Sequence, residues 1–395
     1  EALPAVSLEG PRAVGKTRTA QRRANTIYEL DDPVQRQVVE ADPAALSRGD
    51  PPILVDEWQR VPETWDVVRR AVDAGAEPGR FLLTGSATPG DRPSHSGAGR
   101  IVTVRMRPLT LAERLPGTSA TVSLARLLEG GRPAVSGRTE LGLADYVEEI
   151  TASGFPGLQQ LDGRPLREQL DSYLRRIVDT DFEQLGRSVR KRGALMRWMR
   201  AFAAATATTA TYEAIRDAAT SGQGEKPART TTRPYREVLE QLWIIDQVPA
   251  WLPSRNYFSR LSRPPKHHLA DPALAARLLG VEAGALLRGD EPGPVVPRDG
   301  TLLGHLFESL VTLCVRVYGQ AAEARVSHLR TKGGRHEVDL IVERGDGRIV
   351  AVEVKMGRAV ESGDVKHLHW LADRMEDDLL DRVVVNTGPA AFRRE

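Results

Sequence analysis

The chain has 395 residues, of which 41% are hydrophobic and 27% are charged, and its formal net charge is +2. This length allows two or three domains with separate cores, and the composition excludes a disordered or fibrous protein. No signal peptide and no apolar run of the ~20 residues that cross a bilayer stands out, so we expect a cytoplasmic protein without membrane contact. Cys314 is the single cysteine, which excludes an intramolecular disulfide and favours a buried thiol in a reducing compartment.

The first third of the chain alternates short apolar runs with amphipathic segments. This alternation is typical of a parallel α/β sheet. We predict a helix near 62–74, and strands at 5–8, 27–30, 53–55, 80–83 and 101–105. Because the first strand begins so close to residue 1, we expect a further segment to precede it in the complete protein.

The loop after the first predicted strand carries the sharpest motif. It matches G-x-x-x-x-G-K-[ST] and stands between that strand and a predicted helix at 18–24. In such a loop backbone N–H groups surround the phosphates, the lysine adds positive charge and the hydroxyl ligates magnesium. We therefore predict a site for ATP and Mg²⁺, formed by Gly10, Pro11, Arg12, Ala13, Val14, Gly15, Lys16 and Thr17.

Two adjacent acids end the third predicted strand, directly after its apolar residues. Asp56 and Glu57 have the arrangement that an ATPase needs beside its phosphate loop. Asp56 would hold magnesium through its bound water, and Glu57 would orient and polarise the water that attacks the γ-phosphate. Together with the phosphate loop, this pair predicts hydrolysis as well as binding.

Two further groups are candidates for the same site. Thr84 or Ser86, after the fourth predicted strand, would contact the γ-phosphate if that strand lies between the first and the third. An ordinary Thr-Gly-Ser turn is the alternative. Arg100 follows the loop that comes after the fourth predicted strand. It is a candidate arginine finger or domain clamp, although arginine is also the usual surface cation of this chain.

Residues 118–290 are predicted to be mainly helical. Candidate helices lie at 146–151, at 166–182 and within 196–220. Between Arg187 and Lys266 there are 15 Arg and Lys but six Asp and Glu. A basic segment of this kind indicates a polyanionic partner more strongly than the overall charge does.

A helix at 230–242, followed by two strands at 243–251 and 266–269, outlines a winged-helix module. The helix would then recognise DNA or RNA, and its phosphates would meet Arg229, Arg233, Arg236, Arg255, Arg260 and Arg263. The alternatives are a solvated basic face or a docking surface for the acidic remainder of the chain.

Residues 291–395 are predicted to form another α/β unit, with a helix at 302–318 before its strands. Asp339 and Glu353 stand at the ends of two adjacent predicted strands, Lys355 follows, and Glu308 lies on the helix. Such carboxylates bind Mg²⁺ or Mn²⁺, and the lysine would stabilise charge or position a water. We predict a second metal site here; ordinary salt-bridged surface residues are the alternative.

Blocks along nearly the whole chain resemble a prokaryotic AAA-type ATPase family in which the ATPase domain is joined to a C-terminal domain of unknown function. The matching blocks are Leu8–Arg12, Lys16–Thr17, Leu54–Pro62, Arg80–Ala87, Met106–Thr110, Gly154–Pro156, Pro265–Lys266, Gly304–Glu308, Glu337–Leu340 and Glu353–Lys355. The resemblance implies an ASCE-type P-loop core over 1–117 and a winged-helix-like middle over 118–290. The last two blocks resemble the PD-(D/E)xK nuclease core, which implies a restriction-endonuclease-like α/β domain over 291–395.

These observations predict a Mg²⁺-dependent ATPase coupled to a nuclease-like domain that acts on nucleic acid, and a homo-oligomer that completes the ATPase site. The first alternative is a nucleotide-gated regulatory or binding protein of the defence or toxin–antitoxin type, without nuclease activity. The second is a winged-helix DNA-binding protein whose phosphate loop only stabilises the fold.

Overall fold

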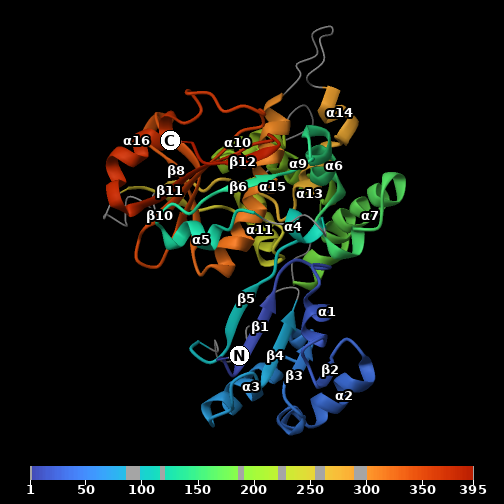
Figure 1. The fold of residues 1–395 in the computed structure, drawn as a ribbon. Helices are drawn as coiled ribbons and strands as arrows, with labels where there is room; N and C mark the ends of the chain where they lie inside the picture. The colour runs from blue at the N-terminus through green and yellow to red at the C-terminus, as the bar shows by residue number, and fades with distance from the viewer. Residues whose placement is uncertain are drawn as a thin grey trace.

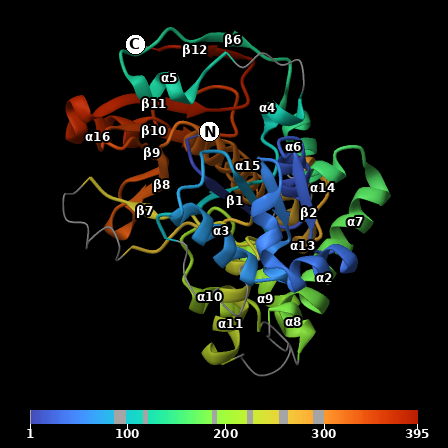
Figure 2. The same ribbon diagram turned by 90° about the horizontal axis from the view of Figure 1, so that it is seen from below.

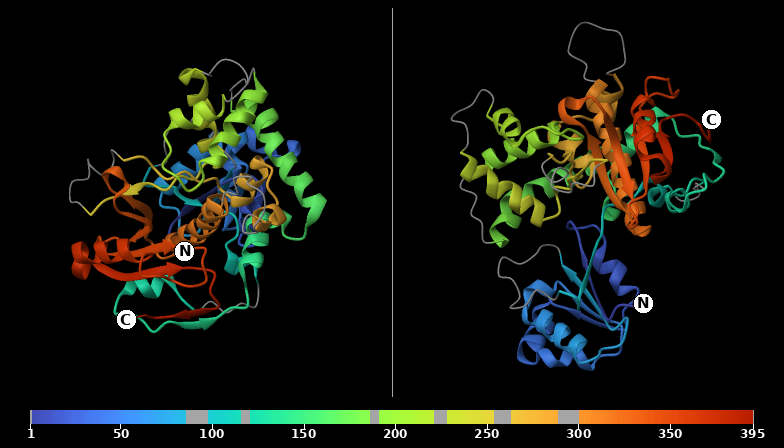
Figure 3. Two further views of the ribbon diagram at one scale, coloured as in Figure 1. Left: turned by 90° about the horizontal axis from the view of Figure 1, so that it is seen from above. Right: turned by 90° about the vertical axis from the view of Figure 1, so that its left-hand side faces the viewer.

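The structure is a computed structural model that describes residues 2–85, 98–115, 121–185, 191–220, 228–253, 263–288 and 300–394. Figure 1 shows a small N-terminal lobe below a larger body. The chain passes from the lobe to the body through strand β5 (Val102–Arg105). The right-hand view of Figure 3 shows the same two parts and the narrow connection between them.

The N-terminal lobe is built on a five-stranded parallel sheet with the strand order β2–β3–β4–β1–β5. Its other strands are β1 (Ala5–Glu9), β2 (Thr26–Glu29), β3 (Ile53–Asp56) and β4 (Phe81–Gly85). Every strand lies within two residues of its predicted range, because a short run of apolar and β-branched residues between turn residues is a local signal. The prediction of a parallel sheet is confirmed.

Helices cover both faces of this sheet and give the lobe a core of its own. They are α1 (Lys16–Gln21), α2 (Pro33–Ala41) and α3 (Glu63–Asp73). Trp58 and Trp65 pack in that core, with ring centroids 4.6 Å apart. All carboxyl ends of the parallel strands lie at one edge of the sheet, and in Figure 1 this edge faces the body.

A helical region follows, after the single turn α4 (Leu111–Arg114). Its helices are α6 (Leu143–Ala152), α7 (Gly163–Arg176), α8 (Phe182–Gln184), α9 (Arg192–Ala204), α10 (Tyr212–Ala218), α11 (Arg229–Gln241), α13 (Pro272–Leu279) and α14 (Ala283–Leu287). The helix predicted over 166–182 is interrupted, because the chain changes from α7 into a π-helix at Ile177–Asp181. The segment predicted over 196–220 is two helices, separated by a turn in which Ala207 has φ 58°.

The C-terminal domain is a mixed five-stranded sheet with the order β11–β10–β9–β8–β7. Its strands are β7 (Ala250–Trp251), β8 (Arg325–Arg330), β9 (Glu337–Glu343), β10 (Ile349–Val354) and β11 (Leu379–Val385). The helix α15 (Gly300–Ala321) packs on one face and α16 (Lys366–Met375) on the other. A short ribbon of β6 (Ser136–Arg138) and β12 (Ala390–Phe392) lies beyond α5 (Leu124–Glu129), as Figure 2 shows.

The predicted winged-helix module is not shown. Among the described residues, the two predicted wing segments meet in antiparallel bridges, Ile245 to Leu269 and Val248 to Lys266. The end of the first segment becomes β7, which adds to the C-terminal sheet parallel to β8. Burial of Trp251, whose indole N–H donates to Glu343 Oε1 at 3.1 Å, draws this strand into that sheet.

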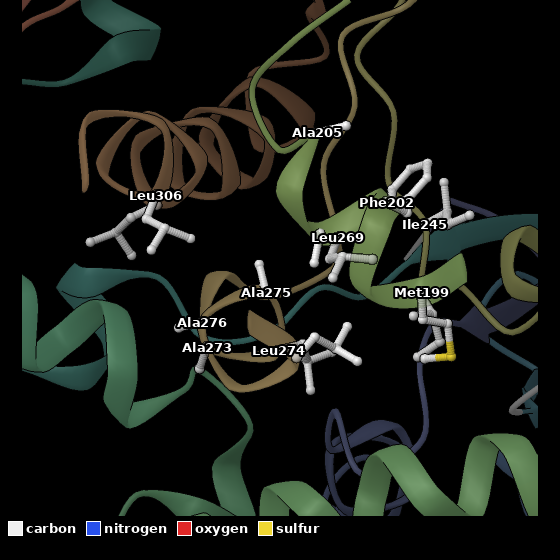
Figure 4. Packing of buried hydrophobic residues seen from close by; sticks show 14 of the residues in the cluster. Met199, Phe202, Ala205, Ile245, Leu269, Ala273, Leu274, Ala275, Ala276 and Leu306 are labelled. Atoms are coloured by element: carbon white, nitrogen blue, oxygen red, sulfur yellow. The ribbon is translucent and has the colours of Figure 1, made fainter. Parts of the chain in front are cut away.

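One hydrophobic core joins the helical region to the C-terminal domain. Figure 4 shows Phe202 of α9 beside Ile245 and Leu269, with α13 and its Leu274 between these residues and Leu306 of α15. At 302–321 α15 has the length and composition of a membrane span, which the sequence analysis overlooked. Leu306 and Leu310 are fully buried in this core, as in the central helix of a globular domain.

Candidate nucleotide-binding site

The predicted phosphate loop and the predicted acids meet at the edge of the N-terminal sheet that faces the body. β4 lies between β1 and β3, and Thr84 pairs in register with Leu8 on one side and with Asp56 on the other. This order places the end of β4 directly between the loop after β1 and the acids after β3. Thr84 therefore lies beside Asp56, in the strand between the first and the third, as its predicted role requires.

The phosphate loop depends on glycine at Gly10, where two backbone segments nearly touch. A Cβ atom there would lie 2.3 Å from the carbonyl oxygen of Met106. The Met106 N–H donates to Glu9 O at 2.7 Å, so this contact extends the pairing of β1 with β5. Gly15 has φ 95° at the start of α1, a left-handed conformation that favours glycine.

Two threonine hydroxyls donate to the same carboxylate oxygen. Thr17 Oγ1 donates to Asp56 Oδ1 at 2.8 Å, and Thr84 Oγ1 donates to the same atom. Asp56 is 5% exposed. Hydroxyl and carboxylate oxygens are the ligands that magnesium prefers. The donor set therefore fits Mg²⁺ bound together with a nucleotide, with Thr17 and Asp56 as its protein side.

Lys16 is held inside the loop that it would serve. Its ammonium donates to Gly10 O and to Pro11 O, each at 2.8 Å. Burial lowers the pKa of Lys16 to about 8, although Glu57 and Asp56 oppose this shift. A phosphate would compete with the two carbonyls for the ammonium, and it would add the negative charge that a buried lysine lacks.

Glu57 leaves the strand in a left-handed conformation, with φ 53° and ψ 44°. The turn brings Gln59 back toward it, and Gln59 Nε2 donates to Glu57 Oε2. A Cβ atom on Gly85 would lie 2.8 Å from Gln59 Oε1, so the lack of a side chain at Gly85 makes room for this amide. Gln59 orients the carboxylate; it stands in the matching block Leu54–Pro62, but its contact with Glu57 depends on this turn.

The helical region touches the phosphate loop directly, and the sequence analysis missed this contact. The Arg12 guanidinium pairs with Asp181 Oδ1 at 2.8 Å, and the Tyr173 hydroxyl donates to Arg12 O at 3.3 Å. Val14 is buried in the core shared by the helical region and the C-terminal domain. The residues in contact are more than 150 positions apart in the sequence, so no local sequence pattern predicts the contact.

Arg100 lies at the wrong edge of the sheet to reach the phosphate loop of its own chain. It precedes β5, and β5 runs parallel to β1, so Arg100 lies near the amino ends of the strands. Its guanidinium pairs with Asp73 at 2.7 Å. Arg100 therefore does not reach the phosphate loop of its own chain, and that part of the prediction is corrected; a role as an arginine finger for a second copy of the chain, or as a domain clamp, stays a prediction. Ser86, the alternative to Thr84, lies outside the described residues.

The four residues of the predicted second metal site do lie together, but around a lysine. Lys266 Nζ is 2.7 Å from Glu308 Oε1 and 3.1 Å from Asp339 Oδ1. Asp339 Oδ2 accepts from the backbone N–H of Val354 at 2.9 Å, and Lys355 Nζ donates to Glu353 Oε1 at 2.8 Å. Within the described ranges no group of three or more His, Cys, Asp or Glu residues is placed to hold a metal ion.

The electrostatics of this acidic centre explain why a lysine lies there. Lys266 is 1% exposed; burial lowers its pKa, but Glu308, Asp339 and Glu337 together outweigh burial and raise it. Burial and then the charge of Asp339 raise the pKa of Glu353 to about 7. Lys266 and Lys355 both supply positive charge to this carboxylate group, and Arg330 pairs with Glu337 at 3.1 Å.

Three of the six arginines predicted to bind nucleic acid pair with acidic neighbours. Arg229 pairs with Glu213. Arg233 pairs with Glu237 at 2.7 Å, and Arg236 lies 3.6 Å from Glu240 with its guanidinium over the Tyr212 ring. Arg263 Nε is buried without a hydrogen-bond partner among the described residues. Arg255 and Arg260 lie outside the described residues.

Comparisons with known proteins agree with the geometry of the N-terminal site. Residues 3–115 match a family model described as an AAA domain. The match supports an AAA-type P-loop ATPase domain with ATP as its ligand. We call the N-terminal lobe the ATPase domain from here on. Residues 143–285 and 303–395 match two models described as domains of unknown function, DUF8612 and DUF4143.

Two curated relatives are uncharacterized proteins of Mycobacterium bovis and Mycobacterium tuberculosis. Each is 31% identical over 286 residues, which cover 71% of this chain and 57% of the relative. The chain thus spans less than two thirds of their length. Among solved structures, the Walker-type ATPase of Pyrococcus abyssi has 16% identity and a TM-score of 0.38, over 70% of this chain and 91% of that chain. The ORC2 protein of Aeropyrum pernix has 12% identity and a TM-score of 0.28, over 78% and 88%.

Proposed function

We propose that this protein is a Mg²⁺-dependent ATPase that uses ATP as a switch. The observation that carries the proposal is that the hydroxyls of Thr17, in α1, and of Thr84, in β4, both donate to Asp56 at the end of β3. Backbone N–H groups of Gly10–Thr17 would surround the phosphates. When bound, Mg²⁺ would neutralise charge between the β- and γ-phosphates.

The chain's own residues divide the work of hydrolysis. Lys16 would move from its two carbonyl partners to the phosphates, and Thr17 with Asp56 would hold the metal. Glu57, oriented by Gln59, would hold the attacking water and draw its proton. Thr84, which contacts Asp56, would also contact the γ-phosphate. The proposal includes a homo-oligomer, in which a second copy of the chain completes the site.

Substitution of Glu57 tests the hydrolytic role. We expect Glu57→Gln to retain MgATP and to lower phosphate release by about 100-fold or more, because a positioned general base contributes 10²–10⁴-fold. Lys16→Ala should lose most of its affinity for ATP. The matched control is Glu63→Gln, an exposed acid in the first turn of α3, which should change neither quantity. Unchanged turnover in Glu57→Gln would refute the role of Glu57.

For the C-terminal domain we propose a binding or regulatory role without nuclease activity. The observation that favours this alternative is the Lys266 ammonium, which lies among the carboxylates that a nuclease would use for metal. Its ion pairs tie the segment before α13 to α15 and β9. On this proposal the ATPase domain controls a binding partner rather than strand cleavage. The competing function, metal-dependent cleavage of DNA or RNA, draws on the same four predicted residues.

Incubation with DNA distinguishes the two roles. With plasmid or single-stranded DNA and either Mg²⁺ or Mn²⁺, we expect the full chain to leave the nucleic acid intact, with or without ATP. Cleavage that disappears in Asp339→Ala but persists in Asp378→Ala, an exposed acid of the same domain, would establish the nuclease and overturn our proposal. ATP turnover measured with and without DNA would show whether nucleic acid is the partner.

A further inference from the structure

Arg12 connects the phosphate loop to the helical region by its side chain and by its backbone. Its guanidinium lies 2.8 Å from Asp181 Oδ1. Its carbonyl accepts from the Tyr173 hydroxyl at 3.3 Å. Two residues later, Val14 is buried in the core that contains α7. The loop that would surround the phosphates is therefore attached at two positions to one helix of a different region.

Asp181 is presented to Arg12 by an unusual piece of backbone. It is the last residue of the π-helix that continues α7, and such wide turns are frequent at functional sites. The carboxylate is 5% exposed, and its second cation, Arg176, is 3.8 Å away with 59% of its side chain exposed. Burial raises the pKa of Asp181, against the charge of Arg12. Arg12 is thus the principal counter-ion of a buried carboxylate.

Nucleotide phosphates would disturb this pair in two ways. They would compete with Asp181 for a guanidinium that matches either anion in geometry. They would also bring negative charge close to a carboxylate that is screened little from it. Both effects have the same sign, because each makes the pairing of Arg12 with Asp181 unfavourable while phosphate is bound.

We propose that Asp181 is a positioning residue of the nucleotide site, which holds Arg12 on the helical region and competes with the phosphates of ATP for its guanidinium. ATP binding then weakens the contact between the π-helix and the phosphate loop, and that contact weakens ATP binding by the same factor, because linkage is reciprocal. The inference rests on the proposed function. Since α7 packs in the core shared with the C-terminal domain, this contact is one route by which nucleotide occupancy reaches the rest of the molecule.

Affinity for a nucleotide tests the competition. The probe is a fluorescent, non-hydrolysable ATP analogue with Mg²⁺, titrated into the full chain. We expect Asp181→Asn to bind it about 5- to 10-fold more tightly than the natural chain, the range of ordinary allosteric coupling. Asp181→Glu, which keeps the charge, should bind within about 2-fold of the natural chain. An ion pair that merely supports the loop predicts the opposite sign, a loss of affinity in Asp181→Asn.

The control is a second ion pair of the same helix. Asp171 on α7 accepts from Arg277 at 2.6 Å through both carboxylate oxygens and does not touch the phosphate loop. Asp171→Asn should leave nucleotide affinity unchanged. As an independent readout, hydrogen exchange of residues 173–181 in the natural chain should become faster when the analogue binds.

The outcomes separate this inference from the proposed function. If the natural chain does not bind the analogue at all, the proposed ATPase function fails. If the natural chain binds it but Asp181→Asn binds equally or more weakly, the competition is wrong while the ATPase function stands. Slower exchange over residues 173–181 on binding would also overturn the competition.

Discussion

At Gly10 the backbone of the phosphate loop passes so close to β5 that no side chain fits between them. The nearest atom to a Cβ there would be the Met106 carbonyl oxygen at 2.3 Å, which is backbone and cannot move aside alone. The motif requires glycine here so that the backbone can surround phosphates. The structure adds a second reason, the close approach of the Met106 carbonyl. The same residue joins the loop to the strand that leads out of the ATPase domain.

Gly10→Ala is expected to destabilise the ATPase domain by about 1–3 kcal/mol, the usual cost of forcing an extra methyl group into a packed position. Nucleotide affinity should fall with it, because the loop must shift. Thermal unfolding and nucleotide titration measure the two effects. Gly157→Ala is the control: a Cβ there meets nothing within 4 Å, so a change under about 0.5 kcal/mol is expected. Equal effects of the two substitutions would contradict this account.

Among single residues, those in the motif were predictable and their partners were not. Lys16, Thr17 and Asp56 are identified by spacing and by their place after a strand. Gln59 stands in the matching block Leu54–Pro62 but outside the acidic pair, and Asp181 stands in no block, although they orient Glu57 and Arg12. Arg100 directly precedes β5, so it lies at the amino ends of the parallel strands, away from the phosphate loop of its own chain.

At the scale of elements, α15 decides how the body is organised. The amphipathic pattern predicted a helix, but the helix packs against α13 and α6 as well as against the C-terminal sheet. The helical region and the C-terminal domain therefore share a core, whereas the ATPase domain has a separate one. Two unfolding transitions follow from this division, one for the ATPase domain and one for the rest.

Leu310→Ala should shift only one of those transitions in a calorimetric scan. Leu310 is fully buried on α15, and a Leu→Ala change at such a position costs about 2–5 kcal/mol. The transition of the ATPase domain should keep its midpoint. Val38→Ala, on an exposed face of α2, is the control and should change stability by less than about 0.5 kcal/mol. A joint shift of both transitions would show that the two cores are not independent.

The predicted recognition helix shows why a basic element is weak evidence for a nucleic-acid partner. Two arginines of α11 face acids one turn along the same helix, Glu237 and Glu240. This i to i+4 pairing was present in the sequence, and it favoured the alternative of a solvated, internally neutralised face. Contact with nucleic acid through α11 remains a prediction without structural support.

At the scale of the whole molecule, Asp246 joins all three parts. It accepts from Arg107 at 2.7 Å, and it lies 2.8 Å from Arg105 and 2.9 Å from Arg316. Arg105 is the last residue of β5 in the ATPase domain, Arg107 comes two residues later, and Arg316 is on α15. Burial alone would raise the pKa of Asp246, but Arg316, Arg105 and Arg107 outweigh it and hold the pKa well below its usual range.

Asp246→Asn is expected to be among the most destabilising substitutions in the chain. It would leave three arginines at the junction without their shared anion, and breaking a buried ion pair costs about 3–5 kcal/mol. Unfolding by urea measures the loss. The matched control is Asp346→Asn, which removes an exposed pair with Arg344 and should cost no more than about 1 kcal/mol. A similar, small effect at both positions would show that Asp246 does not hold the junction together.

The sequence by itself determined the phosphate chemistry, the parallel sheet and the position of the acids at its edge. Those features are local, because a motif, a strand and the residue after it lie within a few positions of one another. Tertiary structure alone decided that Lys266 fills the acidic centre, that Asp181 holds Arg12 and that Asp246 joins three regions. Each of these contacts links residues from distant segments. A charged side chain pairs with the opposite charge that lies nearest to it in the folded chain. A single sequence shows which residues are charged, but it does not show which of them the fold brings together.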